Sequence, residues 1–194
     1  YGLLGALRQQ QALPVSTLDG LQATWAAQSL QQAADANALA DRWDALPEPL
    51  RTSAPVVSAY ASRAAAMNWD EAATRSLEHA LDTRWDESLV DLYGQLPVTR
   101  FDHRRAQIER WLSAHPSSPA LLLAAARIAH AQGQGPQAEP WLHRAIAQGA
   151  GAPAWELLGD SAVLSGDESR ARLAYANALR SQRGEAVPDL PGRG

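Results

Sequence analysis

The amino-acid sequence predicts an all-α fold in which helical hairpins stack into a right-handed superhelix. Small residues recur at a fixed spacing, most clearly in residues 119–145 and 152–178. A turn signal of glycine, proline, asparagine or aspartate falls in the middle of each copy. No stretch alternates apolar and polar residues as a half-buried strand would. Together these observations favour repeated helix–turn–helix units over any fold that contains a sheet.

In each copy a small residue of the first helix lies 12 positions before a central alanine, and a second small residue follows it by 7. The four triplets are Ala61, Ala73 and Ala80; Gly94, Ala106 and Ser113; Ala126, Ala138 and Ala145; and Gly159, Ala171 and Ala178. The period of roughly 33 residues between central alanines is typical of stacked helix–turn–helix repeats. Because two helices cross closely only where side chains are small, the spacing has a steric cause. The pattern resembles the tetratricopeptide repeat, and chance alignment in an alanine-rich chain is the alternative.

Residues 1–52 are expected to form N-terminal helices that make an atypical, capping repeat. A first helix is expected within residues 3–11, and Ser16 or Thr17 can cap a second. Asn37 is expected to open a third helix, which prolines close after Leu46.

Residues 53–183 are expected to hold four repeats. The first starts at Ser53, and Asn68 is the expected cap of its second helix. Pro97 shortens the first helix of the second repeat, while glycine-containing turns at residues 133–136 and 165–167 divide the third and fourth. Residues 184–194, rich in glycine and proline, are expected to be a disordered tail.

Composition removes several classes of chemistry. The 194 residues carry a net charge of −4, with no cysteine and no lysine. Disulfides, thiolate zinc sites, cysteine nucleophiles and P-loop or Schiff-base lysines are therefore excluded. The charge gives no general electrostatic reason to bind nucleic acid. The five histidines show no i, i+4 pair, and no serine has a recognisable base nearby, so we expect no enzyme, no metal and no cofactor.

The seven tryptophans invite two interpretations, core packing or an aromatic cage for a ligand. Four of them fall on apolar helical stripes beside small residues, which favours packing: Trp25, Trp111, Trp141 and Trp155. Trp69 and Trp85 stand at helix starts and are expected to be partly exposed.

In a superhelix of this kind the first helix of each repeat lines the concave face. Counting from the repeat phase places six polar side chains in that groove as a partner-binding set: Asp91, Gln95, Arg127, His130, Glu156 and Asp160. The charges alternate in sign along the groove, which suits an extended or helical peptide. The alternative is that these side chains are merely solvated.

Several longer stretches carry a more specific resemblance. They are Trp43-x-x-Leu46-Pro47-x-x-x-Arg51, then Tyr60-Ala61, Ala80-Leu81-x-x-x-Trp85-Asp86-x-x-Leu89-Val90-x-x-Tyr93-Gly94, and Glu109-x-Trp111-Leu112-x-x-His115-Pro116-x-x-Pro119-x-Leu121-Leu122. Over most of residues 40–180 the chain resembles the HemY family of proteobacterial haem biosynthesis. It departs at Ala126, where the family often has glycine, and at residues 135–137, where the family often carries Trp-Gly-Lys.

The resemblance implies the soluble C-terminal domain of a bacterial inner-membrane protein whose two N-terminal spans precede this chain, with a cytoplasmic location favoured. It implies an association with late haem biosynthesis and supplies no catalytic residues. The sequence therefore predicts a non-catalytic scaffold whose partners are proteins, among them late haem-biosynthesis enzymes. A haem or porphyrin carrier is the alternative, because one axial histidine needs no local motif.

Overall fold

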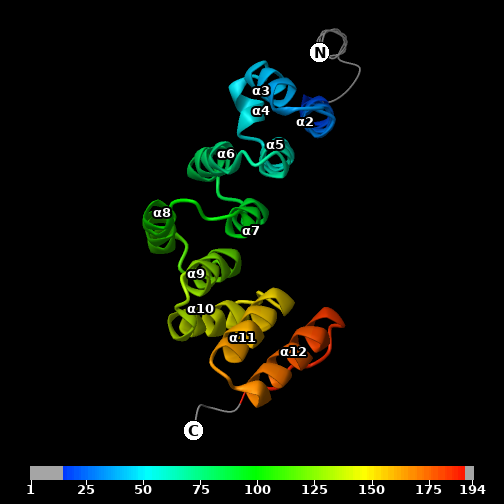
Figure 1. The fold of residues 1–194 in the computed structure, drawn as a ribbon. Coiled ribbons are helices and arrows are strands. Elements are labelled where there is room, and N and C mark those ends of the chain that lie inside the picture. Colours follow the sequence, from blue (N-terminus) through cyan, green and yellow to red (C-terminus); the bar gives the residue numbers. More distant parts are fainter. Residues whose placement is uncertain (1–14, 191–194) are drawn as a thin grey trace. The chain divides into compact units, whose positions relative to one another are not determined.

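The computed structural model describes residues 15–190, and every regular element within that range is a helix (Figure 1). The helices are α2 (Val15–Gln31), α3 (Ala36–Asp44), α4 (Glu48–Arg51), α5 (Ala54–Ala66), α6 (Asp70–Thr83), α7 (Glu87–Gln95), α8 (Phe101–Ala114), α9 (Pro119–Ala131), α10 (Gly135–Ala147), α11 (Ala152–Leu164) and α12 (Glu168–Gln182). The helix expected within residues 3–11 lies outside the described residues. The all-α prediction is confirmed for the part that is described.

The chain divides into two compact units, the first ending at Pro97 and the second beginning at Val98. Each unit is a set of packed helices and is described by itself. The right-handed superhelix and the domain boundaries after residues 52 and 183 remain predictions.

Unit 1 is built around α5, which packs against α2, α3, α4, α6 and α7. Its inward stripe includes Val57, Tyr60 and Ala61, all buried. The Tyr60 ring stacks on Trp43 of α3 with ring centroids 3.9 Å apart. The α3 cap is Asp35, whose carboxylate accepts from the Ala38 N–H at 2.8 Å, so the expected start at Asn37 was two residues late.

Asn68 does not cap α6 as expected. Its φ of 60° is left-handed, and the following Trp69 N–H donates to the Ala64 carbonyl at 2.8 Å. This geometry closes the C-terminus of α5, because a left-handed residue lets the chain turn back onto the last helical carbonyls. Gly133 and Gly166 have the same left-handed backbone in the later repeats. Asparagine tolerates that region better than most other residues do.

Unit 2 confirms the small-residue spacing in its last two hairpins. Ala126, Ala138 and Ala145 are buried where α9 packs on α10. At the α11–α12 crossing a Cβ added to Gly159 would lie 2.5 Å from Cε1 of Tyr175, so any larger residue there would require the Tyr175 ring to move. Ala171 and Ala178 are buried on the same crossing.

The second copy of the triplet was placed two residues out of register. Ala106 and Ser113 of α8 are exposed, while Arg104 and Trp111 take the buried positions. The reason is Pro97, which forces Leu96 into an extended conformation (ψ 143°) and ends α7 early. As a result, α8 starts two positions earlier than the repeat requires. In the other three pairs, the distance from the start of the first helix to the start of the second is longer by those two residues.

The tryptophans differ in how deeply they are buried. Trp111 and Trp155 are buried, as the packing interpretation predicted. Trp25 is 46% exposed, so for this residue the prediction was wrong. Trp69 and Trp85 are half-buried, as expected for helix starts.

The first part of the expected disordered tail packs against unit 2. Residues 184–190 form no helix, but Val187 and Leu190 pack against its core. Asn177 Nδ2 donates to the Pro188 carbonyl at 2.9 Å. Residues 191–194 are not described.

Candidate functional site

Two of the six residues predicted to line a groove lie on α7 of unit 1. Asp91 and Gln95 are one helical turn apart, and Gln95 Nε2 donates to Asp91 Oδ2 at 2.7 Å. Gln95 is exposed and Asp91 half-buried, so the pair presents a polar edge on one face of α7.

The other four lie in unit 2, on α9 and α11. Arg127 and Asp160 occupy equivalent positions, since each is the ninth residue of its helix. His130 Nδ1 lies 3.2 Å from Ser161 Oγ, which ties α9 to α11 along this face. The structure thus brings these side chains onto neighbouring first helices, and their role in partner binding remains a prediction.

The two carboxylates of α11 already accept hydrogen bonds from α12. Tyr175 donates its hydroxyl to Asp160 Oδ1 at 2.7 Å, and Gln182 Nε2 donates to Glu156 Oε1 at 3.3 Å. The bond to Asp160 raises the pKa of the Tyr175 hydroxyl, because the carboxylate stabilises the protonated phenol. Both carboxylates are exposed and keep further lone pairs for a ligand.

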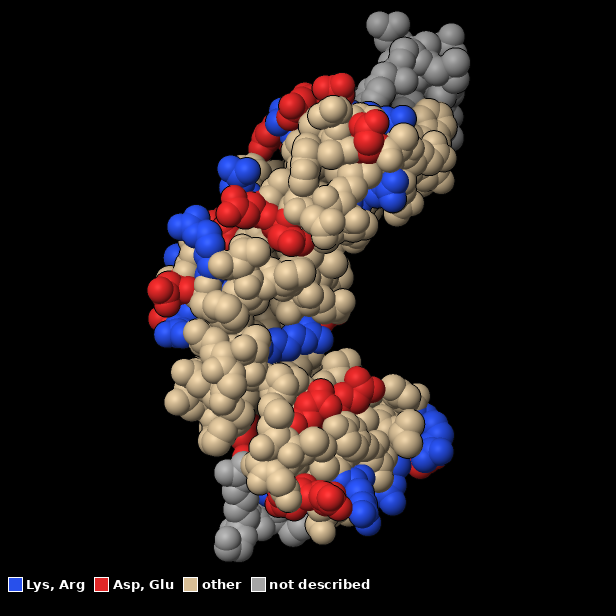
Figure 2. Space-filling model, in the orientation of Figure 1, with Lys and Arg blue, Asp and Glu red and all other residues tan. Residues whose placement is uncertain are grey.

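Charge on the surface is mixed. On the face drawn in Figure 2, basic and acidic side chains of the described residues are interspersed. On such a face, specificity comes from local charge pairs.

The described residues contain no group of three or more histidines and carboxylates that could hold a metal ion. His79 lies 2.6 Å from Glu48 Oε1, and His143 lies 3.4 Å from Glu139 Oε1. The bond from His79 lowers the pKa of the Glu48 carboxyl. The predicted absence of a metal, of a cofactor and of catalysis remains untested.

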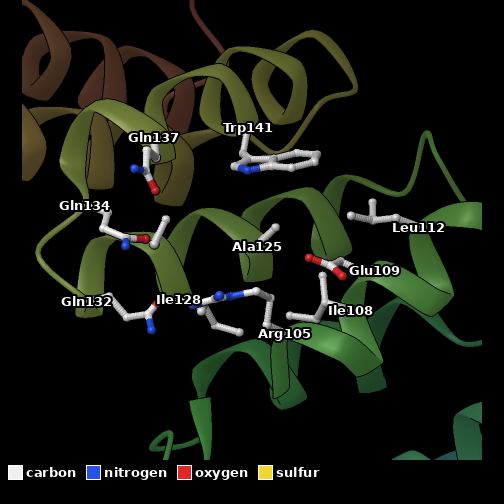
Figure 3. Close-up of a pocket in the computed structure, with 11 residues that line it drawn as sticks. Arg105, Ile108, Glu109, Leu112, Ala125, Ile128, Gln132, Gln134, Gln137 and Trp141 are labelled. Carbon is white, nitrogen blue, oxygen red and sulfur yellow. Dashed lines mark hydrogen bonds between the residues drawn. The ribbon is translucent and has the colours of Figure 1, made fainter. Parts of the chain in front are cut away.

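A pocket that the sequence interpretation missed lies within unit 2, between α8 and α10 and above α9 (Figure 3). Its volume is about 250 Å³. The floor comes from α9, and Trp141 of α10 lies across from Leu112 of α8. The lining combines apolar residues, Ile108, Leu112, Ala125, Ile128, Ala129 and Trp141, with polar residues, Arg105, Glu109, Gln132, Gln134 and Gln137.

The polar rim of this pocket is partly ordered by its own contacts. Arg105 Nη2 donates to Gln132 Oε1 at 2.7 Å, which links α8 to the end of α9. Arg144 lies with its guanidinium carbon 5.1 Å from the Trp141 ring centroid and donates to the Pro116 carbonyl at 3.1 Å. A half-buried tryptophan held in this way offers an apolar surface that need not reorganise on binding.

The pocket lies on the opposite side of α9 from the predicted groove. Ala125 and Ala129 are four residues apart and share the pocket face. Arg127 and His130 project from the other side, because each residue turns the helix by about 100°. Unit 2 therefore carries two separate candidate surfaces.

The repeat register contained a signal that could have revealed the pocket. Ala125 corresponds to Leu158, since each is the seventh residue of its helix, and Leu158 is fully buried. Because alanine is smaller than leucine, Ala125 leaves a space beside α9 that a leucine at the same position would occupy. Reading the triplet spacing alone could not show this, because Ala125 stands beside the triplet position.

No family model matches the sequence, and no curated protein is detectably similar to it. Among solved structures, MamA MSR-1 C2 superposes with a TM-score of 0.51 at 11% identity, covering 86% of this chain and 99% of that one. MamA is built of tetratricopeptide repeats. The likeness shows a helical-repeat fold of the tetratricopeptide type. No helix among the described residues is long and apolar enough to cross a membrane.

Proposed function

We propose that this chain is a non-catalytic scaffold that binds other proteins. The observation that carries the proposal is the polar face shared by α9 and α11 on stacked helical hairpins. Arg127 and His130 lie on α9, Glu156 and Asp160 lie on α11, and the contact between His130 and Ser161 joins the two helices. Charged side chains on a rigid helical surface fix the orientation and identity of a partner more than they raise affinity.

Arg127 is the residue that we expect to contribute most. Its guanidinium can bind a carboxylate of the partner through two parallel hydrogen bonds, a geometry that lysine cannot copy. Replacing it with alanine should weaken partner binding, and thermal unfolding of the same variant measures any change in stability separately. The matched control is Arg172→Ala, which removes a strongly exposed arginine paired along α12 with Glu168.

At a finer level, we propose partners among the late haem-biosynthesis enzymes, on a protein held at the bacterial inner membrane. The support is the sequence resemblance across residues 40–180 described above. The test measures the binding of purified late haem-biosynthesis enzymes, one at a time, to wild type, Arg127→Ala and Arg172→Ala. Binding lost only in Arg127→Ala supports the proposal, and equal binding by all three chains contradicts the role of this face.

A haem or porphyrin carrier is the competing function, with His130 as the candidate axial ligand. Haemin absorbance measured on wild type and His130→Ala separates the two. A haemin spectrum that His130→Ala abolishes, together with protein binding that ignores Arg127, would favour the carrier. If none of the late haem-biosynthesis enzymes binds to the wild-type chain, the proposed haem association is wrong. The scaffold proposal is then tested separately: proteins that bind to the wild-type chain should not bind to the Arg127→Ala variant.

A further inference from the structure

The groove between α8 and α10 has a counterpart one repeat later, between α10 and α12. The two grooves have different residues at equivalent repeat positions. The first has Arg105, Gln137 and Trp141, and the second has Glu139, Arg170 and Ala174 in the same order. Glu139 and Arg170 form an ion pair that bridges α10 and α12. The contacts made at the second groove therefore indicate what kind of segment the first groove could bind.

The chain's own C-terminal segment contacts the face of α12 that borders this second groove. Arg170, Ala174 and Asn177 are buried and lie on one face of α12, at i, i+4 and i+7. The ion pair to Glu139 shows that this face is turned toward α10. Asn177 on the same face donates to the Pro188 carbonyl, so the segment runs along the α10 side of α12.

The segment binds through two kinds of contact. Val187 and Leu190, three residues apart, pack their side chains against the core of unit 2. The Pro188 carbonyl accepts a hydrogen bond from a side-chain amide at 2.9 Å. Pro188 also restricts the backbone, because proline fixes its own φ and keeps the preceding residue extended.

We propose that the pocket between α8 and α10 binds a short extended segment of a partner protein, with two aliphatic side chains flanking a proline as in residues 187–190. This inference rests on the proposed scaffold function and assigns it a second surface. The pocket offers contacts of the same two kinds at other positions of the repeat: an apolar floor with Ala125 and Trp141, and side-chain amides on its rim. Gln134 and Gln137 supply amides that can bond a peptide backbone as Asn177 does.

The size of the pocket favours side chains of a peptide over a free small molecule. Its volume of about 250 Å³ lies below the roughly 300–1,000 Å³ typical of small-molecule sites. Ala125 sets the depth of the floor, and its counterpart in the next repeat is a larger and fully buried leucine, Leu158. A leucine at position 125 should therefore occupy the site that the partner's side chain would take.

The test uses a fluorescein-labelled peptide of residues 184–190, Gly-Glu-Ala-Val-Pro-Asp-Leu, titrated with the full chain and followed by anisotropy. We expect saturable binding that Ala125→Leu weakens at least tenfold. Ala106→Leu is the matched control, because Ala106 is an exposed alanine of α8 outside the pocket, and it should change affinity less than twofold. A peptide with serine in place of its valine and leucine should not bind.

Three results would overturn the inference. Wild type that shows no saturable binding at millimolar peptide would do so. So would Ala125→Leu with unchanged affinity and an unchanged unfolding midpoint. A chain that self-associates in sedimentation, and loses this association in Ala125→Leu, would assign the pocket to a second copy instead. None of these outcomes touches partner binding through Arg127, so the scaffold can survive the loss of this pocket.

Discussion

The α8–α9–α10 and α10–α11–α12 layers of unit 2 are built on the same plan. The first, called the open layer, holds a pocket beside Ala125, whereas the second, called the closed layer, has a fully buried leucine, Leu158, at the same position. In the closed layer Leu158 is fully buried, and Arg170 of α12 pairs with Glu139 of α10. In the open layer the corresponding residues are Ala125, Gln137 and Arg105. Arg105 bonds Gln132 of α9 rather than reaching α10.

The difference shows how a repeat protein gains a site without altering its fold. Side chains at the small positions of the triplet set how closely the two helices of a hairpin approach, and these are small in both layers. The residues beside them decide whether the space between successive hairpins is filled. A ligand surface can therefore change between repeats while the helices stay in register.

The largest expected effect follows from opening the closed layer. Leu158→Ala removes a fully buried side chain and should lower the free energy of unfolding by about 2–5 kcal/mol. Chemical denaturation measures it. Leu179→Ala, at a site 57% exposed, is the control, and a loss as large there would mean that burial does not set the cost.

Breaking the bridge across the closed groove comes next. Arg170→Met removes the cation that pairs with Glu139 and should cost about 1.5–3 kcal/mol, since a nearly buried carboxylate loses a charged hydrogen-bond donor. Arg172→Met removes an exposed i, i+4 pair and should cost less than about 0.5 kcal/mol. Equal midpoints for the two variants at unchanged denaturant slope would contradict the ranking.

The register slip in α8 can be tested with one pair of variants. Ala138→Leu overfills a buried helix crossing and should destabilise by about 1–3 kcal/mol. Ala106→Leu changes an alanine that the triplet spacing placed at the same kind of crossing but that is exposed, so its effect should stay within about 0.5 kcal/mol. If Ala106→Leu were the more harmful, the slip would be wrong.

The smallest effect is expected from closing the open layer. Ala125→Leu places in α9 the residue that α11 has at the same position and should raise stability by no more than about 1 kcal/mol. Thermal melting of this variant beside wild type measures it. A loss of several kcal/mol would show that the pocket is too shallow for a leucine.

Much of the fold could be read from the sequence because the repeat imposes its own steric rule. The spacing of Ala126, Ala138 and Ala145 requires two helices that cross closely, wherever the hairpin lies in the chain. Turn residues indicated where helices end, although Asn68 was predicted to cap the start of α6 and instead closes the end of α5. Asparagine can cap a helix start or accept a left-handed conformation, and its local sequence suits both.

The candidate site was less accessible to sequence reasoning. The polar residues of α9 and α11 were found because they follow from the repeat phase. The pocket exists because the small side chain of Ala125 leaves space and because α8 lies at its edge. The position of α8 in the sequence is shifted because α7, the helix before Pro97, is short. A register counted from alanines cannot detect that displacement, because Arg104 and Trp111 take positions that small residues hold elsewhere.

The sequence by itself determined that the chain forms helical hairpins, which helix of each comes first, and where three of the four small-residue crossings lie. These properties are local, since they depend on residues within a single hairpin. Only the tertiary structure decided that Leu158 fills its layer while Ala125 leaves space, and that residues 184–190 lie against α12. Both depend on contacts between successive hairpins or with the chain end, where the gain from burial is set by a neighbour's shape.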